Sequence, residues 1–180
     1  MKSLSIALSV LASLLMAGSA MSVLHTAWRE TMELRVRIAR SGLWALVPVA
    51  VWNAVLTSHL PVGVSDASAV PNALLVFEAV GRGFVFAAAA LLPLGVSEPW
   101  QRLGLVVFVT GSVLYLLSWL PLLLDPTPSW WRLLPYALPF VWLLGLALML
   151  RSRAYIAGSL PFVVAHVAHG ALVTKAMLRS

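Results

Sequence analysis

Residues 103–124 have the sequence LGLVVFVTGSVLYLLSWLPLLL, an apolar run without a single Asp, Glu, Lys or Arg. A helix needs about 20 predominantly apolar residues to cross the hydrocarbon core of a bilayer, which is about 30 Å thick. This run is long enough and apolar enough to do so. It therefore predicts a transmembrane helix.

Five further apolar segments have a similar length, and connections containing Pro, Ser, Asp or Arg separate them. Of the 180 residues, 61% are hydrophobic and 10% are charged, whereas soluble domains have about 45–50% apolar and about 25% charged residues. We therefore predict an all-α, polytopic transmembrane helix bundle of about six spans, forming a single integral membrane domain over residues 1–180. The predicted spans are 3–24, 42–60, 72–96, 103–124, 133–150 and 154–174.

The net charge of +6 is the kind of excess that reports membrane orientation and contact with anionic lipids in a membrane protein. The arginines lie at span ends without a contiguous basic face, so we expect no nucleic-acid partner. The expected partners are the lipid bilayer and a small solute or a membrane protein, and the oligomeric state stays open. Cysteine is absent, which excludes disulfides, thiolate metal sites and thiol redox chemistry.

The N-terminal segment has two interpretations. A lysine, an apolar run and the small residues AGSA at 17–20 resemble a secretory signal peptide, with cleavage near Ala20. The segment that follows is short and rich in arginine, which favours the cytoplasmic side. We therefore favour an uncleaved first span and keep the signal peptide as the alternative.

The distribution of Lys and Arg over alternate loops predicts the orientation. One side receives Arg29, Arg35, Arg37, Arg40, Arg102, Arg151 and Arg153, and the other receives Lys2, Arg132, Lys175 and Arg179. Because basic loops tend to stay in the cytoplasm, both termini are expected on the non-cytoplasmic side. We expect the protein to be integral to the plasma (inner) membrane.

The third predicted span contains two charged residues, Glu78 and Arg82. Each charged residue inside hydrocarbon costs about 2.5–3.5 kcal/mol on insertion scales, so such residues are usually paired or line a cavity. Their i,i+4 spacing places them on one helix face, where they can form an ion pair. The pair either only makes insertion tolerable or forms part of a functional site, and we expect the two residues to act as a coupled unit.

Further polar side chains lie at a similar depth. His166 and His169 are spaced i,i+3 in the sixth span and share a face. Because helix direction alternates, groups late in even-numbered spans lie in the same half of the bilayer as Glu78, which is early in span three. The candidate pocket or ligand-binding residues are Glu78, Arg82, His166, His169, His59, Tyr115, Ser118 and Asn53.

Several of these side chains are potential ligands of a cofactor. Imidazole and carboxylate suit zinc and related ions, which makes His59, His166, His169 and Glu78 the metal-ligand candidates. Two histidines on different helices are also a haem-ligating pattern. Histidines equally serve as hydrogen-bonding groups between helices, so we predict no cofactor and keep a divalent metal and haem as alternatives.

The functional hypothesis is a small multi-pass membrane protein with an intramembrane polar pocket in its non-cytoplasmic half. This pocket would bind or conduct a small solute or a proton, or the protein would assist a larger membrane complex. The alternative is a membrane-embedded metal- or haem-dependent enzyme or redox protein that uses His59, His166 and His169. No phosphate loop, dinucleotide fingerprint or nucleophile elbow is present, so no catalytic residue is assigned.

Overall fold

The computed structural model describes residues 2–29, 34–57, 59, 68–124 and 130–178, and the regular secondary structure of this part of the chain is helical throughout. Five helical stretches of it are long and apolar enough to cross a membrane, and they are Ser9–Trp28, Asn72–Leu91, Pro99–Leu124, Trp131–Met149 and Arg153–Met177. A sixth apolar helix, over Leu43–Leu56, is shorter. These findings confirm the prediction of an all-α transmembrane helix bundle.

The helices follow one another along the chain with short connections. They are α1 (Lys2–Arg29), α2 (Leu34–Ala39), α3 (Leu43–Thr57), α4 (Asn72–Leu91), α5 (Pro99–Ser118), α6 (Leu120–Leu124), the 3-10 turn η1 (Trp130–Leu133), α7 (Leu134–Ala137), α8 (Pro139–Met149) and α9 (Arg153–Met177).

The surface of the bundle is apolar, as a lipid environment requires. Leu11, Val106 and Val164 each expose more than half of their area, and these residues belong to three different helices. Polar side chains, in contrast, are found inside: Glu78 is 3% exposed and Ser159 is fully buried. Burial of polar groups beneath an apolar exterior is the arrangement expected for a membrane protein.

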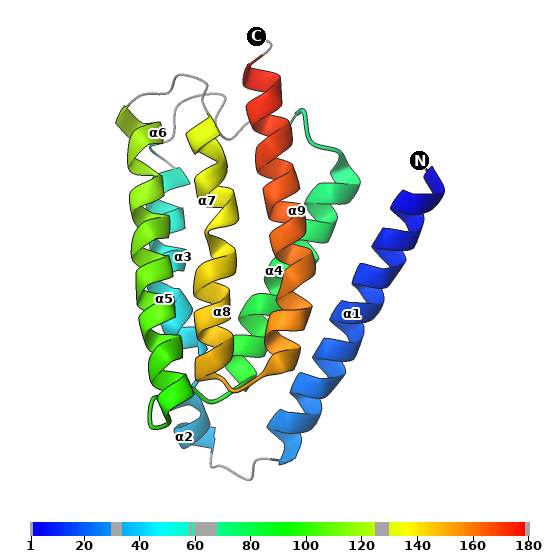
Figure 1. Ribbon diagram of the computed structural model, residues 1–180. Coiled ribbons are helices and arrows are strands. Elements are labelled where there is room, and N and C mark those ends of the chain that lie inside the picture. Colours follow the sequence, from blue (N-terminus) through cyan, green and yellow to red (C-terminus); the bar gives the residue numbers. More distant parts are fainter. Residues whose placement is uncertain (1, 30–33, 58, 60–67, 125–129, 179–180) are drawn as a thin grey trace.

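The helices alternate in direction, so α1 begins and α9 ends at the same end of the bundle (Figure 1). The connections from α4 to α5 and from α8 to α9 lie at the opposite end (Figure 1). Which end faces the cytoplasm stays a prediction from the basic residues. Five of these residues have side chains outside the described part of the structure: Lys2, Arg29, Arg35, Arg37 and Arg179.

The closest helix pair is α5 with α8, and glycine makes this approach possible. A Cβ atom at Gly104 would lie 2.8 Å from the carbonyl oxygen of Gly145, and one at Gly145 would overlap the backbone of Phe108. One helical face of α5 continues to Gly111, where a Cβ atom would lie 2.8 Å from the Trp142 amide nitrogen. Small residues at such positions let helix backbones come close in lipid, where packing replaces the hydrophobic effect.

The end of the bundle opposite the termini is tied together by backbone hydrogen bonds. The Gly42 amide donates to the Leu92 carbonyl at 3.0 Å, and the Leu94 amide donates to the Arg40 carbonyl at 2.5 Å. This pairing is possible because α4 ends at Leu91, before Pro93, where the residue preceding a proline favours extended backbone. The apolar run of the sequence continues to residue 96, but the helix does not.

Proline also divides the fifth apolar segment. Helix α7 ends at Ala137 and α8 begins at Pro139, because a proline nitrogen has no hydrogen to donate within a helix. This break matters for the site, since α7 carries Tyr136. The ring of Tyr136 packs against α9 at Gly170, where a Cβ atom would overlap the ring.

Candidate functional site

The site forms where α4 and α9 pack closely together. At Gly81 of α4, a Cβ atom would lie 2.8 Å from the Cβ atom of Phe162 on α9. One helical turn further toward the end that carries the termini, Glu78 therefore faces His166 and His169. The close approach at glycine explains how a short carboxylate side chain reaches a neighbouring helix.

Both oxygens of the Glu78 carboxylate are occupied by groups from these two helices. Oε1 lies 2.9 Å from Nδ1 of His166 and 2.5 Å from Nη2 of Arg82, and Oε2 lies 2.6 Å from Nδ1 of His169. The i,i+3 spacing of the histidines sets one imidazole on each oxygen, and the i,i+4 spacing brings Arg82 from the same helix. We refer to Glu78, Arg82, His166 and His169 as the carboxylate cluster.

The geometry defines which nitrogen of each imidazole carries hydrogen. An ionised carboxylate only accepts hydrogen bonds, so Nδ1 of His166 and of His169 must be the donor. In a neutral ring, the Nε2 atom is then the remaining site for an incoming proton. With both rings neutral, the charges of Glu78 and Arg82 cancel.

The members of the cluster differ in exposure. The Glu78 side chain is 4% exposed and the two imidazoles are 15% and 19% exposed, whereas the Arg82 side chain is 55% exposed. The carboxylate is thus enclosed, and the guanidinium extends toward the surface of α4. The Glu78–Arg82 pair predicted from the sequence exists, but it belongs to a larger group.

Aromatic rings cover the histidines. The Phe162 ring stacks on His166 with centroids 5.3 Å apart, and the Tyr136 ring lies 5.0 Å from His166 and 5.8 Å from His169. Tyr136 is not among the candidates selected from the sequence, because a tyrosine near a span end is typical of interfacial anchoring. Its role beside the histidines depends on the break before α8 and on the space at Gly170, neither of which a hydropathy pattern reveals.

A second polar pair joins α3 and α5. The Tyr115 hydroxyl donates to Oδ1 of Asn53 at 2.5 Å. Tyr115 interacts electrostatically with the Arg82 guanidinium and with Tyr136, so the pair lies in the neighbourhood of the carboxylate cluster. The sequence grouped Tyr115 and Asn53 with the cluster by depth, and the structure adds that they bond to each other.

The other two candidates bond to carbonyl groups of their own helices. The Ser118 hydroxyl donates to the Tyr115 carbonyl at 2.6 Å. Nδ1 of His59, an exposed residue after the end of α3, lies 2.9 Å from the Val55 carbonyl oxygen. Neither of these bonds is directed to the carboxylate cluster.

The positions of the side chains in the cluster limit how they could bind a metal ion. Among the described residues, no group of three or more His, Cys, Asp or Glu side chains is placed to hold a metal ion. The Nδ1 atoms of His166 and His169 are at hydrogen-bonding distance from the Glu78 oxygens, and a zinc ion with bonds of about 2.0–2.2 Å to both atoms of such a pair needs a wider separation. A metal or a haem would therefore have to be ligated through the Nε2 atoms.

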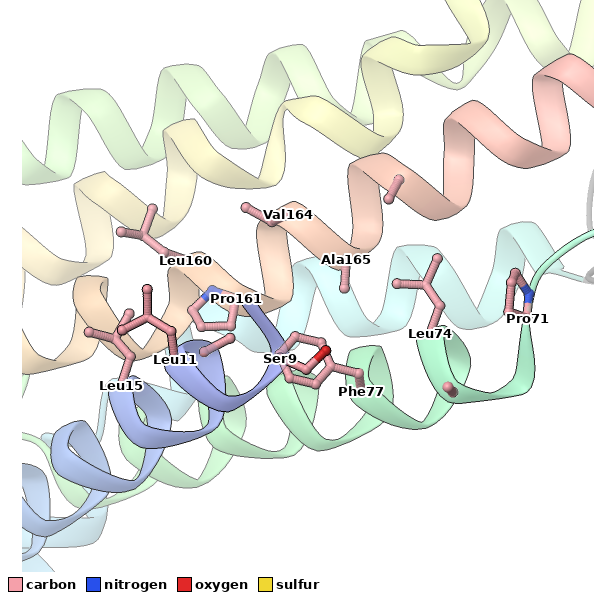
Figure 2. A pocket seen from close by; sticks show the side chains of 13 residues that line it. Ser9, Leu11, Leu15, Pro71, Leu74, Phe77, Leu160, Pro161, Val164 and Ala165 are labelled. Atoms are coloured by element: carbon pink, nitrogen blue, oxygen red, sulfur yellow. The ribbon is translucent and has the colours of Figure 1, made fainter. Parts of the chain in front are cut away.

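An apolar groove of about 730 Å³ lies next to the cluster, between α1, α4 and α9 (Figure 2). Helix α1 diverges from the bundle toward its N-terminal end, which opens this groove (Figure 1). Helix α9 turns Pro161 and Ala165 toward the groove and its histidines toward Glu78. The lining residues are Ser9, Leu11, Ala12, Leu15, Pro71, Ala73, Leu74, Phe77, Leu160, Pro161, Val164, Ala165 and Ala168.

No protein-family model, curated protein or solved structure matches this chain. Function must therefore be inferred from the arrangement of the side chains themselves.

Proposed function

We propose that this protein binds protons within the membrane, and passes them on, at the carboxylate cluster. The observation that carries the proposal is the buried carboxylate of Glu78, each of whose oxygens faces the Nδ1 atom of a histidine on another helix at 2.6–2.9 Å. Intramembrane carboxylates and histidines in contact are the components of proton relays. Imidazole is the side chain whose charge changes near physiological pH.

The geometry supports reversible proton uptake without an unpaired buried charge. A proton that binds to Nε2 of His166 produces an imidazolium, and its Nδ1–H still donates to Oε1 of Glu78. The same holds for His169 and Oε2. Loss of the proton restores the neutral ring and leaves the hydrogen bond in place, so a single carboxylate supports either ring in both states.

The placement of the cluster indicates from which side protons would exchange. His166 and His169 lie in the second half of α9 and Glu78 in the first half of α4, toward the end of the bundle where α1 begins and α9 ends (Figure 1). The basic residues predict that this end is non-cytoplasmic. We therefore expect exchange with the non-cytoplasmic side.

The test uses the small number of histidines in the chain, which are His25, His59, His166 and His169. With ¹⁵N-histidine label and the protein in lipid nanodiscs, each ring gives its own resonances over a pH titration. We expect His166 and His169 to change protonation over the titrated range and to influence each other. The Glu78→Gln variant should alter both titrations and leave His25 and His59 unchanged.

Two results would decide against the proposal. The first is that neither His166 nor His169 changes protonation in this range, and the second is that Glu78→Gln leaves both titrations as they are. Proton transfer across the bilayer is measured separately, with a pH-sensitive dye inside proteoliposomes and a potassium diffusion potential. A flux in the wild type that Glu78→Gln abolishes would extend binding to conduction.

A further inference from the structure

Arg82 is the exposed member of the carboxylate cluster, and its position is unusual for an arginine. It lies ten residues into the 20-residue helix α4, about 15 Å along the helix from either end, which places it near the middle of the hydrocarbon. Its Nη2 atom contacts Glu78, yet 55% of the side chain is exposed. A guanidinium has five N–H donors, and leaving them against lipid tails is costly. This face of α4 therefore requires a polar counterpart.

The charges around Arg82 indicate the sign of that counterpart. If one imidazole of the cluster binds a proton, Glu78 contributes one negative charge and Arg82 and the imidazolium two positive charges. Two tyrosines on neighbouring helices interact electrostatically with the cluster: Tyr115 on α5 with Arg82, and Tyr136 on α7 with Glu78. Arg132 of η1 interacts with Tyr136. None of these is negative at neutral pH.

The acidic residues of the described part of the chain are Glu78 and Glu98. Glu98 pairs with Arg151 at 2.6 Å, at the opposite end of the bundle. Within the described part of the chain, the protonated cluster therefore has an excess of positive charge, which makes an anion the fitting counterpart.

We infer that Arg82 binds a small soluble anion, of the carboxylate class, beside the proton-binding histidines, so that the anion and the proton bind together. The inference rests on the proposed function and names the solute that accompanies the proton. A guanidinium offers paired N–H groups that match the two oxygens of a carboxylate. More than half of the Arg82 side chain is exposed, so its remaining N–H groups are accessible to such a partner.

A lipid headgroup is the less fitting source of the negative charge. The phosphate layer lies about 15 Å from the middle of the hydrocarbon, which is beyond the length of an arginine side chain. The Tyr115–Asn53 pair, whose tyrosine interacts electrostatically with Arg82, is a neutral polar group in the same region and suits a solute that has left water. A soluble anion that enters from the end carrying the termini would meet these groups.

Coupling follows from the shared charges. The proton on His166 or His169 attracts the anion at Arg82, and by linkage the bound anion raises the proton affinity of the histidines by the same factor. The pair enters as a neutral unit, which lowers the electrostatic cost of burying either charge in the membrane.

Acetate is the probe for this site. In nanodiscs of neutral phosphatidylcholine, with ¹⁵N-histidine label and constant ionic strength, acetate should shift the resonances of His166 and His169 in a saturable way. The His25 and His59 resonances should stay in place. The apparent affinity for acetate should be about tenfold weaker at about pH 8 than at about pH 6, within the usual range of coupling between sites.

Variants of Arg82 and a second readout separate the outcomes. Arg82→Gln should abolish the acetate response, and Arg82→Lys should retain a weaker one because it keeps the charge but not the paired donors. Acetate should also raise the melting temperature of the wild type, a measurement that does not depend on the histidines. Glu78→Gln should keep this thermal response, since it leaves Arg82 without its internal partner.

Three results would overturn the inference: equal shifts of all four histidines, an unchanged response in Arg82→Gln, or no response to acetate in either readout. If nanodiscs containing phosphatidylglycerol reproduce the shifts without acetate, the anion is a lipid headgroup and the soluble-anion inference fails. If His166 and His169 titrate together and acetate has no effect, the anion site is refuted and the proton site is not. A thermal response to acetate without histidine titration refutes the proton site.

Discussion

At the scale of single residues, Glu78 and Arg82 do not contribute equally to the cluster. The carboxylate is enclosed and holds three groups, whereas the guanidinium is half-exposed and holds one. Removal of Arg82 leaves Glu78 with both imidazole donors. Removal of Glu78 leaves two imidazole N–H groups and one cation without their acceptor, so the acid should be the more important member for stability.

A double-mutant cycle tests this asymmetry. Arg82→Leu should cost little stability, because Glu78 keeps both imidazole donors and the change removes a charge from the hydrocarbon. Glu78→Leu should cost about 3–5 kcal/mol, as for a buried pair that loses one partner. The double variant should be more stable than Glu78→Leu alone, because it also removes the unpaired cation. Unfolding in detergent, followed by circular dichroism, gives the three values.

The control for this cycle is Arg82→Lys, which keeps the charge and should be close to the wild type in stability. Additive effects of Glu78→Leu and Arg82→Leu on the free energy of unfolding would mean that the two side chains do not interact. The Glu78–Arg82 contact would then have no place in the cluster.

The residue spacings predicted part of this cluster and missed another part. The i,i+4 and i,i+3 patterns correctly identify which side chains share a face on α4 and on α9, because these follow from helix geometry. That the two faces meet depends on the absence of a side chain at Gly81 and on the register of α9 against α4. Single-sequence patterns do not contain that register, and Tyr136 was missed for the same reason.

At the scale of helices, the glycines of α5 and α8 govern the largest helix–helix interface of the described chain. Gly104 and Gly145 bring the two backbones into contact. In a helix, Gly→Ala normally stabilises by about 1 kcal/mol through backbone propensity. A helical position where Gly→Ala destabilises the protein is therefore one where another backbone packs closely against the glycine.

Gly145→Ala should lower the free energy of unfolding by about 1–3 kcal/mol, because its Cβ atom overlaps the Phe108 backbone and overpacking has a cost of this size. Gly83→Ala is the matched control: its Cβ atom meets nothing within 4 Å, so it should be neutral or stabilising. Thermal unfolding of both variants in the same detergent makes the comparison. Equal behaviour of the two variants would contradict the tight α5–α8 contact.

The apolar runs of the sequence predict that the helices exist, but they do not predict at which residue each helix ends. The apolar segments of the sequence continue past Pro93, Pro121 and Pro139, because a proline does not make a segment less apolar. The backbone responds to proline by its missing hydrogen and its restricted neighbour. Helix α4 accordingly ends at Leu91, and α7 and α8 are separate helices.

At the scale of the whole molecule, the orientation in the membrane is open to a direct test. Reporter fusions at Ser68 and Ser180 should both give a non-cytoplasmic signal, because the arginine-rich connection after α1 should stay in the cytoplasm. A fusion at Arg151 is the control and should read cytoplasmic. A cytoplasmic signal at Ser180 would reverse the assignment, and a mature N-terminus near Met21 would support the signal peptide instead.

The hydrogen-bonded end of the bundle has a mechanical consequence. The backbone hydrogen bonds at Gly42, Leu92 and Leu94 hold the start of α3 and the end of α4 together there. The last turn of α4 is therefore restrained by its backbone. When a helix tilts about a fixed end, displacement grows with distance from that end. Asn72, at the start of α4, should therefore move further than Ala88, which lies near the hydrogen-bonded end. Hydrogen–deuterium exchange in nanodiscs should accordingly become faster along α4 from Leu91 toward Asn72, and uniform exchange would contradict this restraint. Glu78 lies between these two extremes, and its bonds to His166 and His169 limit how far this part of α4 can move away from α9.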